Sequence, residues 1–101
     1  MAATVSNANN LNQVIIEGKV THSVGGMLAL KVRNDLTIHF ACDIEDYESR
    51  EKFYGSLIGK EGIKVEGSLE RKNAYKKSIY WIEARKISNK ENKVFFEVES
   101  K

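Results

Sequence analysis

The fold is decided by residues 36–69, which read LTIHFACDIEDYESREKFYGSLIGKEGIKVEGSL. At each end of this stretch apolar and polar residues alternate, which predicts strands with one face on a core, at about 36–42 and 63–69. Between them apolar residues recur at helical spacing opposite acidic ones, and these are Ile44, Tyr47, Tyr54, Leu57 and Ile58. Asp43 is expected to cap this helix, and Gly59 stands where a helix end often needs a left-handed residue.

Alternation outside this stretch predicts the remaining strands. Residues 11–20 and 28–33 form two strands, with Gly25-Gly26 in the connection between them. Asn34-Asp35 is a short turn signal, so the strands on either side of it should form an antiparallel hairpin. After residue 69 comes a basic excursion at 71–77, another strand at 79–85, and a possible sixth strand at 94–99.

This order is three strands, a helix and two strands within one short chain. A closed barrel gives so few strands a core without a long free edge, and a helix between the third and fourth strands is the OB-fold arrangement. We therefore expect an all-β, five-stranded OB-fold barrel over residues 11–88. Residues 1–10 should be a flexible leader, and residues 89–101 a C-terminal extension holding the possible extra strand. Phe95-Phe96 in that strand either covers the barrel or forms an interface.

Composition limits the classes of protein to which this chain can belong. The chain has 101 residues, enough for one domain, and its single Cys42 excludes an intrachain disulfide and metal sites built on several cysteines. It has neither an apolar run long enough to span a membrane nor a secretory signal, so we expect a soluble cytoplasmic protein. A glycine-rich phosphate loop is missing, and Cys42 falls on the inward register of its strand. We expect no enzyme activity, no catalytic residues, no metal and no cofactor.

Charge is unevenly distributed along the chain. The net charge is only +2, but residues 43–51 hold five acidic residues against one arginine. Residues 71–90 hold seven cations against one glutamate, a local charge of +6. Such asymmetry guides the choice of partner better than the total does. Either both segments are solvated faces, or the basic one meets an anionic partner; the acidic one is interpreted as a solvated helix.

The basic segment contains the first set of candidate binding residues. Binding of a single strand needs cations for the phosphates and aromatic faces for the bases. Four cations surround one ring in the loop that OB-folds use for nucleic acid, and these residues are Arg71, Lys72, Tyr75, Lys76 and Lys77. The alternative is an ordinary solvated turn.

A second set falls on the strands. Lys31, Arg33 and His39 project from the outer side of the second and third strands, the usual OB binding surface, although His39 could equally be an ordinary exposed residue. Trp81 shares a strand side with Arg85. It could stack on a base, belong to the core or lie in an oligomer interface, and the pattern leaves all three open.

Three segments resemble strands of the bacterial single-stranded DNA-binding proteins: Asn12–Val20, Gly62–Leu69 and Tyr80–Ala84. The similarity covers about residues 11–88 and extends to primosomal replication protein B. It implies a homo-oligomeric OB-fold that coats single-stranded DNA without a cofactor. It also places Tyr75 at about the position of a stacking aromatic. We expect the oligomer to be a dimer or a tetramer. Replication proteins are further possible partners, and a membrane is not expected.

The chain departs from this family in the short links at Asn34-Asp35 and at residues 21–27, and in ending EVESK instead of an acidic tail with a terminal Phe. These differences favour a specialised paralogue, a phage- or plasmid-type protein or a primosomal accessory. The expected function is largely sequence-independent binding of single-stranded DNA in replication, recombination or repair. The alternative is a primosome- or phage-type protein-interaction module with weak nucleic-acid binding. RNA stays open as a ligand, because no residue is seen to read a 2′-hydroxyl.

Overall fold

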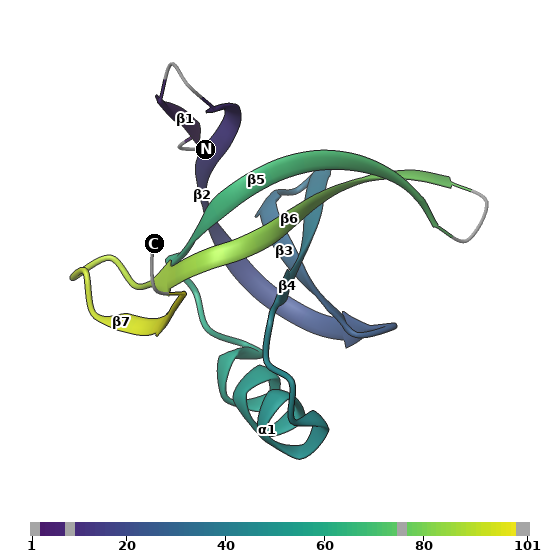
Figure 1. Ribbon diagram of the computed structural model, residues 1–101, viewed down its shortest axis with the longest axis vertical. Coiled ribbons are helices and arrows are strands. Elements are labelled where there is room, and N and C mark those ends of the chain that lie inside the picture. The colour runs from purple at the N-terminus through teal and green to yellow at the C-terminus, as the bar shows by residue number, and fades with distance from the viewer. Residues whose placement is uncertain (1–2, 8–9, 75–76, 99–101) are drawn as a thin grey trace.

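The computed structural model describes residues 3–7, 10–74 and 77–98. Seven strands and one helix make up this part of the chain (Figure 1). Their bounds are β1 Ala3–Asn7, β2 Asn10–Val24, β3 Met27–Arg33, β4 Leu36–Cys42, α1 Tyr47–Leu57, β5 Ile63–Ala74, β6 Lys77–Ser88 and β7 Val94–Glu97.

Five of the strands close into a barrel. β2 pairs with β3, β3 with β4, β4 with β6 and β6 with β5, and β5 returns to pair with β2. Within this ring the β4–β6 pairing is parallel and the other pairings are antiparallel. α1 connects the third strand of the ring to the fourth, and β7 is bonded to β6 outside the ring. The expected OB-like barrel with an extra C-terminal strand is therefore confirmed.

The remaining segments agree with the expectations from the sequence to different degrees. Ala3–Asn7, inside the expected leader, forms β1, which pairs antiparallel with the first half of β2. Gly25 and Gly26 form the turn between β2 and β3, and Asn34-Asp35 links β3 to β4, as expected. On β7 the ring of Phe96 lies 5.9 Å from that of Phe53 on α1, and both phenylalanines of β7 pack against the core. β7 thus covers one side of the barrel.

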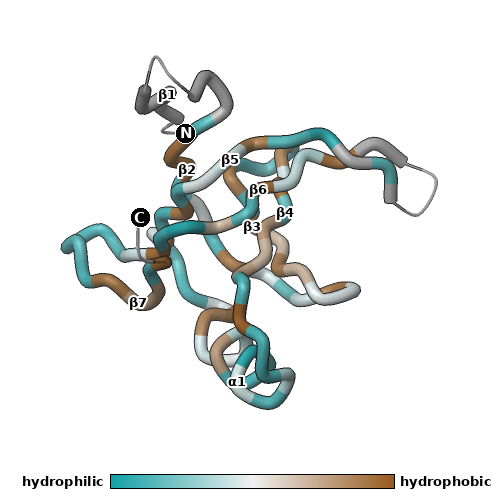
Figure 2. Tube along the Cα trace, in the orientation of Figure 1, coloured by the Kyte–Doolittle hydropathy of each residue, from teal (hydrophilic) through white to brown (hydrophobic). Residues whose placement is uncertain are grey.

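The core forms because inward positions on neighbouring strands fall in register. Leu28 on β3 lies opposite Phe40 on β4, and Phe40 lies opposite Ile82 on β6; all three have no exposed surface. The tube coloured by hydropathy shows apolar stretches on the barrel strands interrupted by polar positions (Figure 2). The largest fully buried side chains are Tyr54, Phe40, Leu28, Leu30, Leu57, Ile63, Ile82, Ile87, Val20 and Val65.

α1 begins later than the spacing of its apolar residues predicts. The Ile44 N–H donates to the Cys42 carbonyl at 2.9 Å, so the chain turns after β4 instead of entering a helix. Asp46, and not Asp43, is the N-cap, and its carboxylate accepts from the Ser49 N–H at 2.8 Å. The prediction of Asp43 as the cap was wrong. Gly59 has a φ of 91°, which confirms the predicted left-handed residue.

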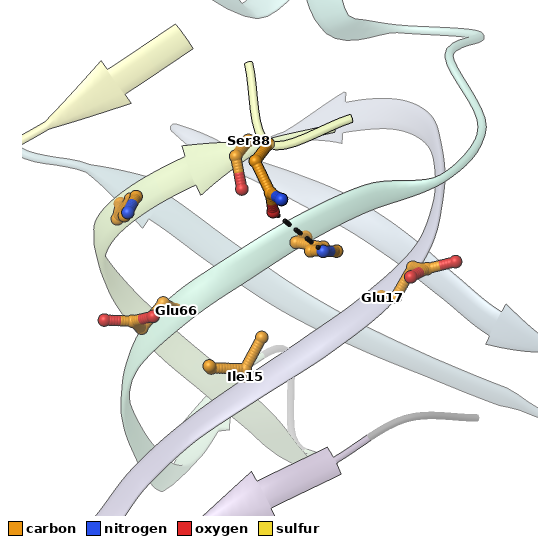
Figure 3. Close-up of a pocket in the computed structure, with 7 residues that line it drawn as sticks. Ile15, Glu17, Glu66 and Ser88 are labelled. Carbon is orange, nitrogen blue, oxygen red and sulfur yellow. Dashed lines mark hydrogen bonds between the residues drawn. The ribbon is translucent and has the colours of Figure 1, made fainter. Parts of the chain in front are cut away.

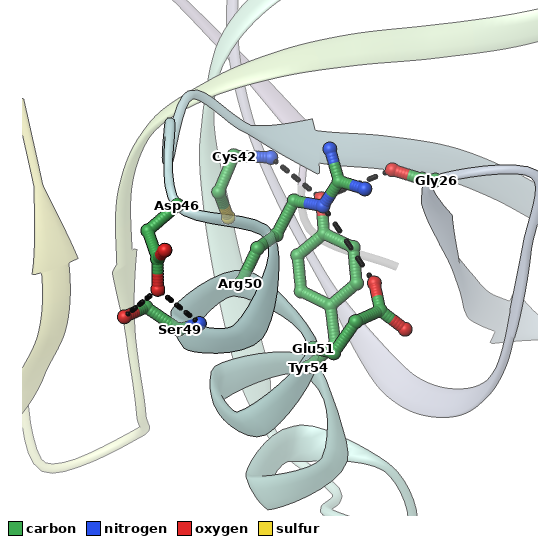
Figure 4. A network of polar contacts seen from close by, with 7 residues as sticks. All are labelled: Gly26, Cys42, Asp46, Ser49, Arg50, Glu51 and Tyr54. Carbon is green, nitrogen blue, oxygen red and sulfur yellow. Dashed lines mark hydrogen bonds and ion pairs between the residues drawn. The ribbon is translucent and has the colours of Figure 1, made fainter.

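Two residues expected on the buried side of α1 lie outside it. Tyr47, the first residue of α1, is 65% exposed, and Ile58, which follows the last helical residue with an extended backbone, is 41% exposed. Tyr54 and Leu57 are buried as expected. The Tyr54 hydroxyl accepts from the Cys42 N–H and donates to the Gly26 carbonyl, both at 3.1 Å (Figure 4). This hydroxyl joins α1 to the end of β4 and to the β2–β3 turn. α1 is too short and too polar to cross a membrane, and the described residues contain no other helix.

Candidate nucleic-acid interface

One row of side chains crosses the outside of the barrel, and we call it the outer row. It consists of His22 on β2, Ala29 on β3, His39 on β4 and Trp81 on β6, each directly opposite the next. Residues directly opposite one another on paired strands project from the same side of a sheet. Trp81 precedes the buried Ile82, so the row faces away from the core. The structure therefore brings His39 and Trp81, two of the predicted site residues, side by side.

His39 is a neutral donor on this surface at pH 7. Burial lowers its pKa, and repulsion from His22 lowers it further. Its Nδ1 is buried and has no hydrogen-bond partner among the described residues. A buried N–H without an acceptor is costly, so the tautomer with the proton on Nε2 is favoured. His39 can then donate a hydrogen bond from Nε2, and it lies opposite Trp81.

Two predicted cations lie on β3, in different surroundings. Lys31 is exposed, two residues along β3 from Ala29, and has Lys19 directly opposite it on β2. Arg33 lies next to the β3–β4 turn and forms an exposed ion pair with Asp35 at 2.9 Å. Lys31 and Lys19 add positive charge next to the outer row, whereas the charge of Arg33 already has an acidic neighbour. Lys19 was not predicted, although its register with Lys31 follows once the strands are aligned.

The basic hairpin is longer than the sequence suggests. β5 and β6 each have 12 residues, against seven in β3 and β4, and their far ends extend beyond the barrel as an arm (Figure 1). We define the arm as residues 71–74 of β5 and 77–80 of β6. In it Arg71 lies opposite Tyr80 and Lys72 opposite Ile79, while Lys77 starts β6. Tyr75 and Lys76 lie outside the described residues.

Tyr80 is an aromatic candidate that the alternation pattern missed. It alternates in phase with the buried Ile82 on β6, but its side chain is 50% exposed. The reason is that the arm continues past the end of the barrel, where an inward register position has no core to pack against. The polar residues opposite this side, Arg71 and Asn73, were the available signal. Tyr80 and the exposed Arg71 thus share one side of the arm.

Arg85 is not part of this surface. It is four residues from Trp81, a distance of about 13 Å along a strand. It lines a separate hollow of about 210 Å³ with Asp43, Ser68, Glu83, Ala84 and Val98, and its carbonyl accepts from the Val98 N–H at 2.8 Å. Two acidic side chains share this hollow with Arg85, so its cation has anionic neighbours there.

A pocket of about 270 Å³ lies where β2, β5 and β6 pair (Figure 3). Its lining residues are Ile15, Glu17, Lys64, Glu66, Lys86, Ser88 and Asn92. The Lys64 ammonium donates to the Asn92 side-chain carbonyl at 3.2 Å. Two lysines and two glutamates balance in charge, so this pocket has no excess positive potential for a phosphate backbone.

Metal-ligating side chains do not gather in the described part of the chain, and the thiol of Cys42 is buried. No group of three or more His, Cys, Asp or Glu side chains among the described residues is placed to hold a metal ion. Cys42 is buried, and burial raises its pKa to about 12, so the thiol is protonated at neutral pH. Its surroundings are those of a small core residue.

Comparisons of the chain with models of protein families, with curated proteins and with solved structures find no match.

Proposed function

We propose that the protein binds single-stranded DNA, largely without regard to sequence and without catalysing a reaction. The observation that carries the proposal is the juxtaposition of His39 and Trp81 on the outer row, next to Lys31. An aromatic side chain on this face offers a stacking platform, and the neighbouring donor and cation suit the phosphate that follows the stacked base. The resemblance of residues 11–88 to the bacterial single-stranded DNA-binding proteins supports the same function.

The arm supplies the second half of the proposed site. Arg71 and Tyr80 lie opposite each other there, and Lys72 and Lys77 belong to the same hairpin. A strand of DNA held on the outer row would continue along this cationic hairpin, with Tyr75 and Tyr80 as further stacking residues. Arg33 and Arg85 contribute less in this proposal, because both have acidic neighbours.

The test is a titration with a thymine oligonucleotide followed by the fluorescence of Trp81, the chain's only tryptophan. We expect the fluorescence to change on binding, and the affinity for the single strand to exceed that for a duplex of equal length. Contacts by Arg71, Lys72, Lys76 and Lys77 predict a salt slope of about −3, at about 0.7 per contact. Equal affinity for both forms would remove stacking from the proposal, and absence of binding would reject it. An RNA oligonucleotide of matched sequence tests whether the protein prefers DNA or RNA.

We further propose that the protein works as a homo-oligomer in the cytoplasm, in replication, recombination or repair. The alternative is a protein-interaction module with weak nucleic-acid binding. One observation favours that alternative: Tyr47 is 65% exposed within the acidic segment 43–51, and an exposed aromatic ring is common in protein interfaces. Loss of DNA binding in every condition, with a folded barrel, would shift the proposal to this module.

A further inference from the structure

Both histidines of the chain belong to the outer row. His22 and His39 lie on either side of Ala29, each directly opposite it on a neighbouring strand. Ala29 has no exposed surface although it faces outward, so its neighbours close over it. Because its side chain is a single methyl group, the two imidazoles are separated only by a small residue. Repulsion from His22 affects the pKa of His39, which agrees with their proximity.

A bulge in β2 positions His22. The register with β3 passes from Val20 opposite Leu30 directly to His22 opposite Ala29, so Thr21 is the extra residue. A bulge can turn two successive side chains toward one face, whereas neighbours in a regular strand point to opposite faces. The Thr21 hydroxyl and the Nδ1 of His22 are indeed 3.0 Å apart. This hydrogen bond holds Nδ1, and it leaves Nε2 of His22 for a ligand.

The charged groups around the pair are few and mixed. Lys31 follows Ala29 by two residues on β3, with Lys19 opposite it on β2. Glu83 follows Trp81 by two residues on β6, and Glu70 on β5 is opposite Trp81. Thr37 and Ala41 flank His39 on β4. No carboxylate lies directly opposite either histidine in the described pairings.

We propose that His22 and His39 form a seat for one phosphate of the bound strand, and that protonation of this pair strengthens binding. The inference rests on the proposed function. It assigns two histidines to binding at the same surface and makes the affinity for the strand depend on pH. A phosphate between the rings accepts hydrogen bonds from their Nε2 atoms. Its charge offsets the repulsion between two imidazolium ions and the cost of a proton on the buried Nδ1 of His39. Binding therefore takes up protons, and by linkage the affinity rises as the pH falls.

The pH range isolates these two groups. They are the chain's only histidines, and ordinary carboxylates titrate well below pH 5.5. The experiment measures the affinity of the full chain for a fluorescent thymine oligonucleotide from pH 7.5 to 5.5 at constant ionic strength. We expect the association constant to rise by up to about tenfold per pH unit for each proton taken up. The salt slope should also steepen by about 0.7 for each protonated histidine.

Variants assign the effect to the pair. His22→Gln and His39→Gln should each flatten the dependence on pH, and the double variant should abolish it. Lys31→Gln is the matched control, because it removes a permanent cation next to the row. It should lower the affinity at every pH and keep the dependence on pH. A pH-independent affinity in the unmodified chain would overturn the inference while leaving DNA binding intact.

A second measurement does not depend on DNA. Imidazole NMR signals of the full chain report the pKa of His39 in inorganic phosphate and in chloride of equal ionic strength. The inference predicts that phosphate raises the pKa of His39 and that His22→Gln weakens this rise. An unchanged pKa of His39 in phosphate would overturn the seat. A raised pKa of His39 without any DNA binding would retain the seat and reject the proposed function.

Discussion

At the scale of single residues, Gly67 lies where the backbones of β5 and β6 come very close together. A Cβ atom built there would overlap the Glu83 carbonyl oxygen of β6, and one at Gly18 would lie 2.5 Å from the Lys31 carbonyl oxygen. Backbone atoms at such a close contact cannot move aside as a flexible side chain can. These two glycines therefore allow β2 and β5 to bend around the core.

Gly67→Ala should destabilise the barrel by several kcal/mol or prevent its folding, because the added methyl group forces two paired strands apart. Gly55→Ala is the matched control. Nothing lies within 4 Å of a Cβ atom at Gly55, which is inside α1, so the change should stabilise the protein by about 0.5–1 kcal/mol. Urea unfolding of the three proteins measures both effects. Equal stability of the two variants would contradict the close contact at Gly67.

Tyr54→Phe removes the hydroxyl that accepts from the Cys42 N–H and donates to the Gly26 carbonyl. Since the Cys42 N–H is buried, losing its partner should cost about 1–3 kcal/mol in the free energy of unfolding. Tyr47→Phe is the control, because the Tyr47 side chain is largely exposed, and it should stay within about 0.5 kcal/mol of the unmodified protein. A similar, small effect of both substitutions in urea unfolding would show that the buried hydroxyl is dispensable.

Cys42 should make the protein sensitive to alkali. Its pKa is raised from 9.0 to about 12 by burial, so the folded state keeps the proton that the unfolded state releases. This contribution is fully present below pH 9 and is lost as the pH rises toward 12, with a slope of at most about 1.4 kcal/mol per pH unit. Cys42→Ala should show a shallower decline in urea unfolding between pH 8.5 and 10. Identical slopes would mean that the thiol ionises in the folded barrel.

At the scale of elements, alternation predicted the strands well where they cover the core and less well where they leave it. Turn residues fixed the β3–β4 hairpin, because Asn34-Asp35 allows few other connections. The extent of the arm was missed, since alternation continues along a hairpin whether or not a core lies beneath it. Tyr80 is therefore half exposed although it alternates in phase with the buried Ile82.

The outer row shows a different limit of the sequence. His39 and Trp81 were both candidates, but their adjacency depends on the parallel β4–β6 pairing, which joins residues 42 positions apart. His22 was not a candidate, because the bulge at Thr21 changes the side of the strand to which it points. A one-residue irregularity cannot be seen in a period-two pattern.

The arm gives the prediction that belongs to this scale. Tyr80→Ala should weaken binding of a thymine oligonucleotide by about 1–3 kcal/mol if the ring stacks on a base, and should leave the salt slope unchanged. Arg71→Gln, on the opposite strand, should lower the affinity and flatten the slope by about 0.7. Both residues are exposed, so thermal unfolding should hardly change. Tyr75→Ala, measured alongside, should resemble Tyr80→Ala. A large loss of stability in Tyr80→Ala would instead assign the ring to packing.

At the scale of the whole molecule, one chain completes its own barrel. The ring closes through the β2–β5 pairing, and the radius of gyration of 12.8 Å is close to the roughly 13 Å typical of a domain of this length. We therefore expect one chain to fold without a partner. A homo-oligomer of this protein should form by contacts between finished barrels, and should dissociate on dilution without unfolding.

The extra strand is where such a contact is expected. Val94 and Val98 lie at and just beyond the ends of β7 and are 43% and 39% exposed, and β7 pairs only with β6 among the described strands. An exposed apolar strand with a free edge favours association. Light scattering at tens of micromolar should give twice or four times the mass of the chain.

Val94→Lys should shift this mass toward the monomer without changing the unfolding midpoint, because a charge at that edge opposes pairing and Val94 adds little to the core. Tyr47→Lys, on the exposed side of α1, is the control and should keep the oligomer. A monomeric mass for the unmodified chain would contradict self-association, and a response to Tyr47→Lys alone would move the interface to the acidic segment.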